Sequence, residues 1–220
     1  MCKIETHSRE KWNGPLTFKH LINGTLAASL LAAVVAVSGP ARAGDTPVPP
    51  SAIKFTNTVT GDALDLNDSL PDGRDTAAVK QFLQTGHNPY NLIESCLPNG
   101  KSLWLSACSG CHGGEMEGKV GPSLADDYWT YETNKTDQGL FSTIFGGANG
   151  MMGPHNQDLT MDQILRVMAW IRFHYEGPKH TDEDMPWLTD AQRKSFKLFK
   201  KEDEAKFPAS EDAKACKLPG

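Results

Sequence analysis

The feature that most constrains this chain is a five-residue motif, Cys108-Ser109-Gly110-Cys111-His112. The pattern C-x-x-C-H is the attachment sequence of c-type haem. Two thiols on one turn can reach the two vinyl groups along one side of a porphyrin and become thioethers. The next residue then lies under the iron as its imidazole ligand. We therefore predict haem c bound covalently at Cys108 and Cys111, with His112 as the proximal ligand.

Two other kinds of site use a C-x-x-C pair. A redox pair as in thioredoxins is expected after a β-strand, and half of a zinc site requires a second Cys/His pair at ligand spacing. The sequence shows neither feature. Haem is therefore the preferred interpretation of the motif.

The residues on both sides of the motif support haem. Upstream, Leu103, Trp104 and Ala107 form one apolar helical face that leads into the cysteines. Downstream, the carbonyl of Pro122 can accept the Nδ1 proton of His112, which would direct Nε2 toward iron. We also assign Leu124, in the same segment, to the haem site.

A second axial ligand is expected from the glycine-rich loop that ends in Met151-Met152-Gly153-Pro154-His155. Glycines let this backbone lie close to a flat haem face, and a thioether raises the potential of the iron. The spacing to Leu159, where a helix opens, favours Met152 over Met151. His155 is a further alternative, which would give a bis-histidine haem. Four other methionines are expected to pack in the core: Met116, Met161, Met168 and Met185.

The N-terminus is typical of an exported protein. An apolar run of 13 residues, Thr25–Val37, follows basic residues and precedes Ala41 and Ala43. It is short for a membrane span, so we predict a signal peptide over residues 1–43, cleaved after Ala43 in export to the periplasm. A retained anchor is the alternative. Residues 1–43 carry five basic and two acidic side chains, so cleavage takes the formal net charge from −5 to −8. Such acidity argues against a nucleic-acid partner.

Periodicity predicts an all-α fold. The helices that carry Leu103-Trp104 and Trp170-Ile171 suggest the crossed terminal helices of a small cytochrome c. A Thr160/Gln163 capping box starts a helix that Gly177-Pro178 should stop, and shorter helices are expected at Thr76–Gln84, Gln138–Phe145 and Thr189–Lys201. We place the core at residues 98–176. Long extensions, residues 44–97 and 177–220, flank it.

Two cysteines remain outside the haem motif once the signal peptide is removed, Cys96 and Cys216. In an oxidising compartment, their pairing would tie the C-terminal extension back to the core. Two free thiols or an intermolecular bridge are the alternatives. Three histidines in polar contexts, His87, His174 and His180, are expected at the surface.

Longer stretches resemble the cytochrome c-L family. The resemblance rests on Cys108–Gly113, Gly121-Pro122, Tyr128–Tyr131 and above all Gly139–Asn156, and it extends from about Asp75 to the Cys216 region. It implies His/Met ligation and a large acidic class I cytochrome. The residues before Asp75 carry no transferable role. Some family members are thought to hold calcium near the haem propionates, but no residue here places such a site.

The resemblance also implies a function. It predicts a one-electron carrier, not an enzyme, that accepts electrons from quinoprotein (PQQ) methanol dehydrogenase and passes them to a further cytochrome c or a terminal oxidase. A general periplasmic cytochrome is one alternative. A haem enzyme or gas sensor, which would need an open iron site, is another.

Overall fold

The fold was analysed in a computed structural model that describes residues 47–177, 185–195, 201–207, 209 and 212–218. The predicted signal peptide lies outside these residues. Within the described ranges the secondary structure is helical, with an isolated bridge between Thr56 and Ala63 in place of any strand. The same residues contain no helix that is long and apolar enough to cross a membrane. The all-α prediction is confirmed.

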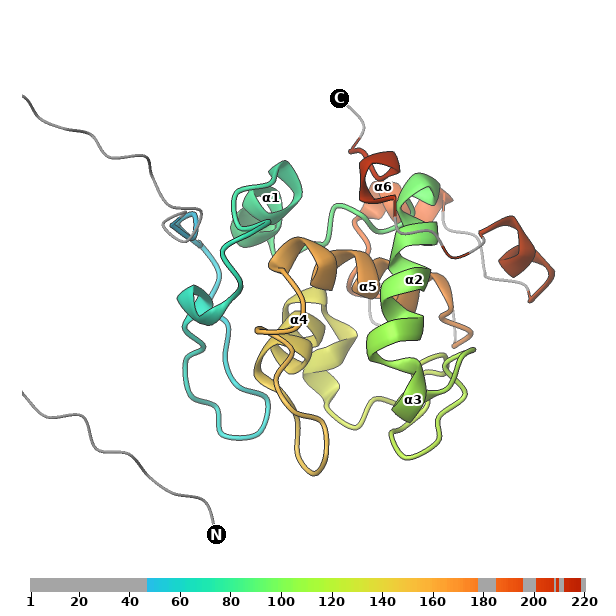
Figure 1. The fold of residues 1–220 in the computed structure, drawn as a ribbon, viewed down its shortest axis with the longest axis horizontal. Coiled ribbons are helices and arrows are strands. Elements are labelled where there is room, and N and C mark those ends of the chain that lie inside the picture. The colour runs from blue at the N-terminus through green and yellow to red at the C-terminus, as the bar shows by residue number, and fades with distance from the viewer. Residues whose placement is uncertain (1–46, 178–184, 196–200, 208, 210–211, 219–220) are drawn as a thin grey trace, which may run out of the picture. The chain divides into compact units, whose positions relative to one another are not determined.

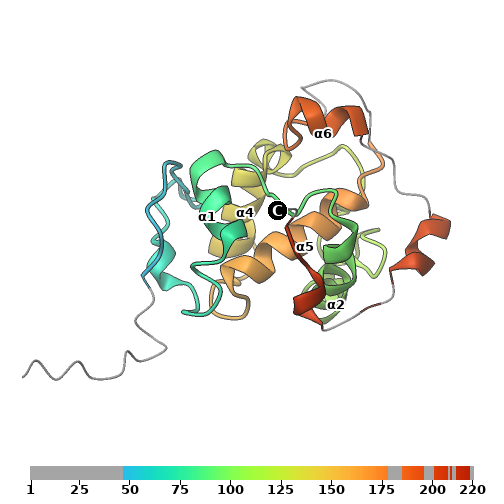
Figure 2. The same cartoon turned by 90° about the horizontal axis from the view of Figure 1, so that it is seen from above.

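The helices follow one another with short connections. Six α-helices are described: α1 (Ala77–Thr85), α2 (Leu97–Ala107), α3 (Ser109–His112), α4 (Asp137–Gly146), α5 (Met161–Phe173) and α6 (Asp190–Ser195). The described residues also form five 3-10 helices: η2 (Leu66–Asp68), which precedes α1, and η3 (Glu94–Cys96), η4 (Glu132–Lys135), η5 (Lys201–Lys206) and η6 (Ala213–Ala215). Figures 1 and 2 show α1, α4, α5 and α2 in this order across the fold.

Helix α5 begins at the capping box that the sequence predicts. Thr160 and Gln163 form the predicted capping box, with the Thr160 side chain accepting from the Gln163 N–H. The helix ends at Phe173, before the predicted stop at Gly177-Pro178. The predicted helices near Thr76–Gln84 and Gln138–Phe145 are present as α1 and α4, and threonine caps the N-terminus of each. Of the predicted Thr189–Lys201 helix, the described part is α6, because residues 196–200 lie outside the described ranges.

Helices α2 and α5 pack closely at Gly100. A Cβ at this position would lie 2.5 Å from the carbonyl oxygen of Arg166 and 3.1 Å from Cβ of Trp170. Only a residue without a side chain lets the two backbones approach this closely. The contact fixes α2, and with it the cysteine motif that follows directly in the chain.

The hydrophobic core includes residues from both predicted extensions. Phe55 packs against Phe82 and Phe141, with ring centroids 5.5 and 5.1 Å apart. Cys96 and Cys216 form a disulfide bond across 120 residues, and Phe207 lies edge-on to Phe173. The extensions therefore complete the core around α2, α4 and α5. The four methionines expected to pack are all buried, so that prediction is confirmed.

Candidate functional site

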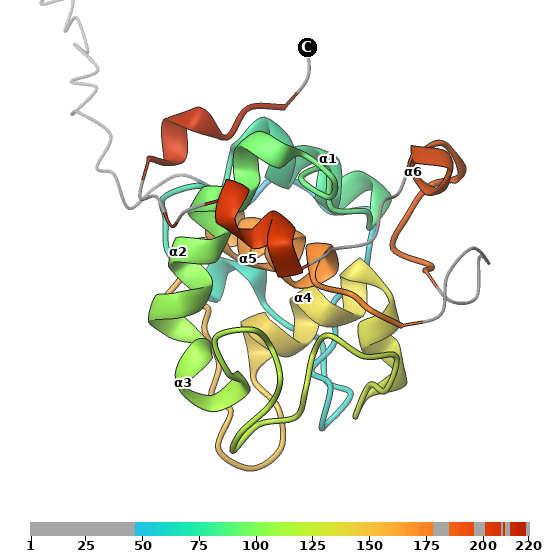
Figure 3. The ribbon, with the colours of Figure 1, turned by 90° about the vertical axis from the view of Figure 1, so that its right-hand side faces the viewer.

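One cavity of about 510 Å³ collects the residues singled out in the sequence. Its volume falls in the range of small-molecule and cofactor sites, roughly 300–1,000 Å³. It is lined by α2, α3, α4, α5 and two loops. Figures 1 and 3 place α3 and the loop that follows α4 at the same end of the fold. The predicted haem residues among its walls are Cys108, Cys111, His112, Pro122, Leu124, Met151, Met152 and His155.

The cysteine side of the cavity is built by one helical turn. The His112 N–H donates to the carbonyl of Cys108, and the Cys108 N–H donates to that of Trp104, so α3 continues almost directly from α2. This turn brings both thiols and the imidazole to the cavity wall. Cys108 is partly buried and Cys111 is exposed.

The His112 ring is held in one orientation. Its Nδ1 lies 2.9 Å from the carbonyl oxygen of Pro122, the contact that the sequence suggests. A Cβ at Gly121 would lie 2.6–3.0 Å from three ring atoms, so the glycine makes room for the imidazole. The Trp104 ring packs against the other side of the histidine, 6.1 Å away between centroids. With Nδ1 occupied by Pro122, Nε2 is the nitrogen left for a metal.

The methionine loop, residues 147–155, supplies another part of the cavity wall. Its glycines Gly147 and Gly150 have φ of +79° and +83°, a conformation that side chains rarely adopt. Met152 is half-buried, whereas Met151 is 82% exposed. His155 also lines the cavity, and its Nδ1 lies 3.3 Å from the Asp158 carboxylate. Met152, which the spacing favours, is therefore the less exposed of the two methionines.

The Cys108 thiol does not have the environment of a reactive redox cysteine. Burial raises the pKa of the Cys108 thiol to about 12, and the neighbouring Cys111 contributes in the same direction. Reactive C-x-x-C pairs have a lowered thiol pKa, because the thiolate is the nucleophile. Within the described residues, no group of three or more His, Cys, Asp or Glu side chains is placed to hold a metal ion. Neither the zinc alternative nor the expected calcium ion gains support.

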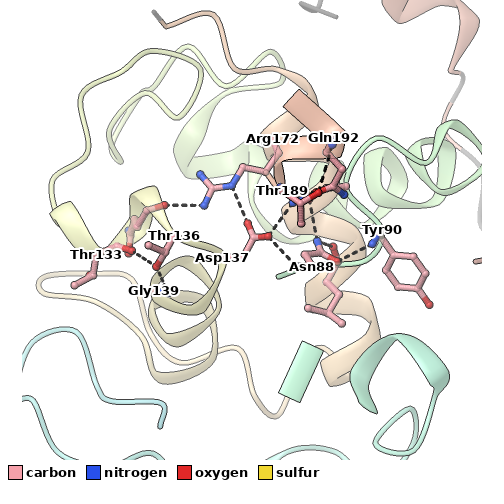
Figure 4. A network of polar contacts seen from close by, with 12 residues as sticks. Asn88, Tyr90, Thr133, Thr136, Asp137, Gly139, Arg172, Thr189 and Gln192 are labelled. Carbon is pink, nitrogen blue, oxygen red and sulfur yellow. Dashed lines mark hydrogen bonds and ion pairs between the residues drawn. The ribbon is translucent and has the colours of Figure 1, made fainter. Parts of the chain in front are cut away.

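A buried ion pair lies behind the cavity wall (Figure 4). Asp137 and Arg172 are 0% and 1% exposed, with 3.1 Å between Oδ1 and Nε. The carboxylate also accepts the backbone N–H of Asn88 and the Nδ2 of Asn91, each at 2.8 Å. The guanidinium lies over the rings of two tryptophans, Trp129 and Trp187. Sequence reasoning did not find this pair, because 35 residues separate its partners and no motif joins them.

One histidine was placed wrongly from the sequence. His174 is 2% exposed, not at the surface. Its Nδ1 lies 3.1 Å from the carbonyl of Trp170, and its ring packs edge-on against the Trp170 ring. The sequence prediction was wrong because His174 directly follows Phe173, the last residue of α5, and caps the buried end of that helix. His87 is partly exposed, and His180 lies outside the described residues.

Comparisons with known proteins show the family of the chain. A curated relative from Methylorubrum extorquens, cytochrome c-L, is 53% identical over 177 residues, which is 80% of this chain and 87% of the relative. The chain belongs to the cytochrome c-L family. A family model described as cytochrome c oxidase, cbb3-type, subunit III matches residues 97–171 of this cytochrome c-L family member.

Two solved cytochrome c-L structures have the same fold. The structure from the marine methylotrophic bacterium Methylophaga aminisulfidivorans is 49% identical, with a TM-score of 0.62 over 67% of this chain and 96% of that one. The structure from Hyphomicrobium denitrificans is 53% identical, also with a TM-score of 0.62, over 74% of this chain and 94% of that one. The predicted class I cytochrome c fold is thereby confirmed.

Membership in the cytochrome c-L family establishes the general chemistry. The chain is an electron-transfer protein, not an enzyme, and carries covalently bound haem c. The residues of the cavity fit this group: two thiols one helical turn apart, an imidazole whose Nδ1 is already engaged, and a thioether on the same cavity. The glycine at position 121 leaves the space that the imidazole needs.

Proposed function

We propose that this chain is a periplasmic mono-haem electron carrier that accepts electrons from PQQ-containing methanol dehydrogenase. It would pass them to a further cytochrome c or a terminal oxidase. The observation that carries the proposal is the convergence of Cys108, Cys111, His112 and Met152 on one cavity, in a chain 53% identical to a cytochrome c-L. The choice of donor rests on the family resemblance.

Four residues would hold the haem. Cys108 and Cys111 would form the thioethers, and His112 would bind iron through Nε2 while Pro122 accepts the Nδ1 proton. Met152 is the proposed second ligand, because it is half-buried in the cavity wall while Met151 is largely exposed. When bound, the haem iron supplies one-electron oxidation and reduction. If His112 and Met152 both bound the iron, no position would stay open for a substrate, as expected of a carrier.

An apolar rim surrounds the cavity mouth. Val120, Tyr128 and Met151 are 72%, 70% and 82% exposed, and all three line the cavity. Exposed apolar side chains gathered at one site mark contact surfaces. Redox encounters use small interfaces that release quickly, so we assign the contact with the electron donor to this rim.

The charge of the exported chain would guide that encounter. We propose cleavage after Ala43, which leaves an acidic protein with a formal net charge of −8, a core at residues 98–176 and extensions at 44–97 and 177–220. An acidic surface speeds association with a basic partner surface, and salt weakens the effect.

The test is reduction of the purified haem-loaded protein by methanol dehydrogenase, followed by stopped-flow absorbance. We expect fast reduction whose rate falls about tenfold from low salt to 1 M salt, because screening removes long-range attraction. A reduction rate that does not change with salt would contradict electrostatic steering, and the proposed contact through the apolar rim would remain.

Other outcomes would identify the alternative functions. Rapid reduction by unrelated donors with none by methanol dehydrogenase would make the chain a general periplasmic cytochrome. Carbon monoxide binding to the native ferrous protein, or turnover of peroxide, would indicate an open iron site and hence a haem enzyme or sensor.

A further inference from the structure

Tyr131 connects two walls of the haem cavity. Its hydroxyl accepts the backbone N–H of Asn149 at 3.0 Å, and both residues line the cavity. Asn149 stands in the methionine loop, three residues before Met152. A side chain from one wall therefore holds the backbone of the loop that carries the proposed ligand.

The methionine loop has few other ties to its surroundings. The Ala148 N–H donates to the carbonyl of Met152 at 2.9 Å, and the Gly150 N–H donates to the Asn149 side chain, both inside the loop. In the part of the chain that the structure describes, Tyr131 provides the only hydrogen bond from residues 148–152 to another segment. The end of the loop is tied to α4, where the His155 N–H donates to the carbonyl of Ile144 at 3.0 Å. Gly150 adds backbone freedom, so residues 148–152 of the loop, which include Met152, depend on the Tyr131 contact.

The backbone of Tyr131 is itself held by a buried residue, Asn134. Its carbonyl accepts the N–H of Asn134 at 2.9 Å, and Asn134 is buried. The Asn134 carbonyl accepts Arg172 Nη2 at 2.8 Å, and its side-chain oxygen accepts the hydroxyl of Thr143 at 2.7 Å. Asn134 thus connects Tyr131 to α5 through Arg172, which Figure 4 labels, and to α4 through Thr143.

We propose that Tyr131 is a positioning residue that keeps the methionine loop closed and thereby maintains the bond between Met152 and the iron. The inference rests on the proposed function, since it takes Met152 as the ligand. Its consequence is an equilibrium: each opening of the loop exposes the iron to an external ligand. The apparent affinity for such a ligand then reports the fraction of open loop.

The test compares two conservative variants of the haem-loaded protein, Tyr131→Phe and Tyr128→Phe. Both keep the ring and remove a hydroxyl near the cavity, but the Tyr128 side chain is 70% exposed and makes no such loop contact. We expect Tyr131→Phe to raise the affinity of the ferric protein for imidazole about fivefold, the effect of losing one neutral hydrogen bond. The sulfur-to-iron band near the red end of the spectrum should weaken with it. Tyr128→Phe should leave the imidazole affinity and the sulfur-to-iron band unchanged, because the Tyr128 hydroxyl does not hold the methionine loop.

A third variant separates this inference from the ligand assignment. Met152→Ala should abolish the sulfur-to-iron band, whereas Met151→Ala should keep it. If Met152→Ala keeps the band, the assignment of the ligand fails. If Met152→Ala abolishes the band but Tyr131→Phe binds imidazole as Tyr128→Phe does, the ligand stands and the role of Tyr131 is overturned.

Discussion

At the scale of single residues, Gly121 and Pro122 act together on His112. The glycine is needed for close approach, since its Cβ would lie 2.6 Å from Cε1 of the imidazole. The proline then offers its carbonyl 2.9 Å from Nδ1 on the same ring. Two adjacent residues thus set both the space for the histidine and its tautomer.

Substitution of Gly121 by alanine should therefore disturb the proximal histidine. The added methyl group has to displace the ring or the backbone, which costs about 1–3 kcal/mol of stability in a packed site. We expect a lower urea midpoint and a changed redox potential in the haem-loaded protein. Gly114→Ala is the control, because a Cβ there meets nothing within 4 Å. Equal midpoints for the two variants would contradict the steric role.

At the scale of helices, the pair Asp137–Arg172 joins the start of α4 to the end of α5. Burial raises the pKa of the Asp137 carboxyl, and the Arg172 guanidinium offsets part of that rise. Burial likewise lowers the pKa of Arg172. The charges are tolerated because each is hydrogen-bonded, and because two tryptophan rings cover the guanidinium. The pair bears on the proposed role of Tyr131, because Arg172 also donates to the carbonyl of Asn134, whose N–H donates to the Tyr131 carbonyl.

Breaking the pair should be costly. Asp137→Ala leaves a buried guanidinium without its partner, which lowers the free energy of unfolding by about 3–5 kcal/mol. Chemical denaturation of the haem-loaded protein measures this loss. Glu132→Ala is the matched control, because the Glu132–Lys135 pair is a surface pair with Glu132 78% exposed, and such pairs contribute about 0–1 kcal/mol. Similar losses in both variants would show that Asp137 has no special role.

At the scale of the whole molecule, segments that are distant in the sequence pack against the central helices. Phe55 and α1 pack on α4 and α5 from the N-terminal side, while the segment around Cys216 returns to Cys96 at the start of α2. In the chain-entropy model, a bridge over 120 residues restricts the unfolded chain strongly. The disulfide therefore stabilises the same helix, α2, that carries the cysteine motif at its end.

The double variant Cys96→Ser/Cys216→Ser should lose about 4–5 kcal/mol of stability in this model. We expect the urea midpoint to fall while the sulfur-to-iron band persists in the folded protein, because neither residue lines the cavity. Counting thiols in the denatured, oxidised wild-type protein provides the control. A free thiol at either position would contradict the disulfide between Cys96 and Cys216.

The sequence determined by itself what depends on local spacing. The haem motif, the Thr160 cap of α5 and the segment from Gly121 to Leu124 are short patterns, in which the chemistry is complete within about a dozen residues. The sequence also predicted helices α1, α4 and α5. One apolar face of α1 is buried, whereas most residues of α4 and α5 are buried. The pairing of Cys96 with Cys216 followed from composition and compartment instead of from geometry.

Tertiary structure alone decided what depends on contacts between distant segments. Burial separated Met152 from Met151, and packing on Trp170 buried His174. The Asp137–Arg172 pair and the contact from Tyr131 to Asn149 join residues 35 and 18 positions apart. Such contacts leave no periodic or spacing signal in the sequence, because they form only when the helices pack. Local chemistry therefore predicted the cofactor, and long-range packing brought together the walls of its cavity.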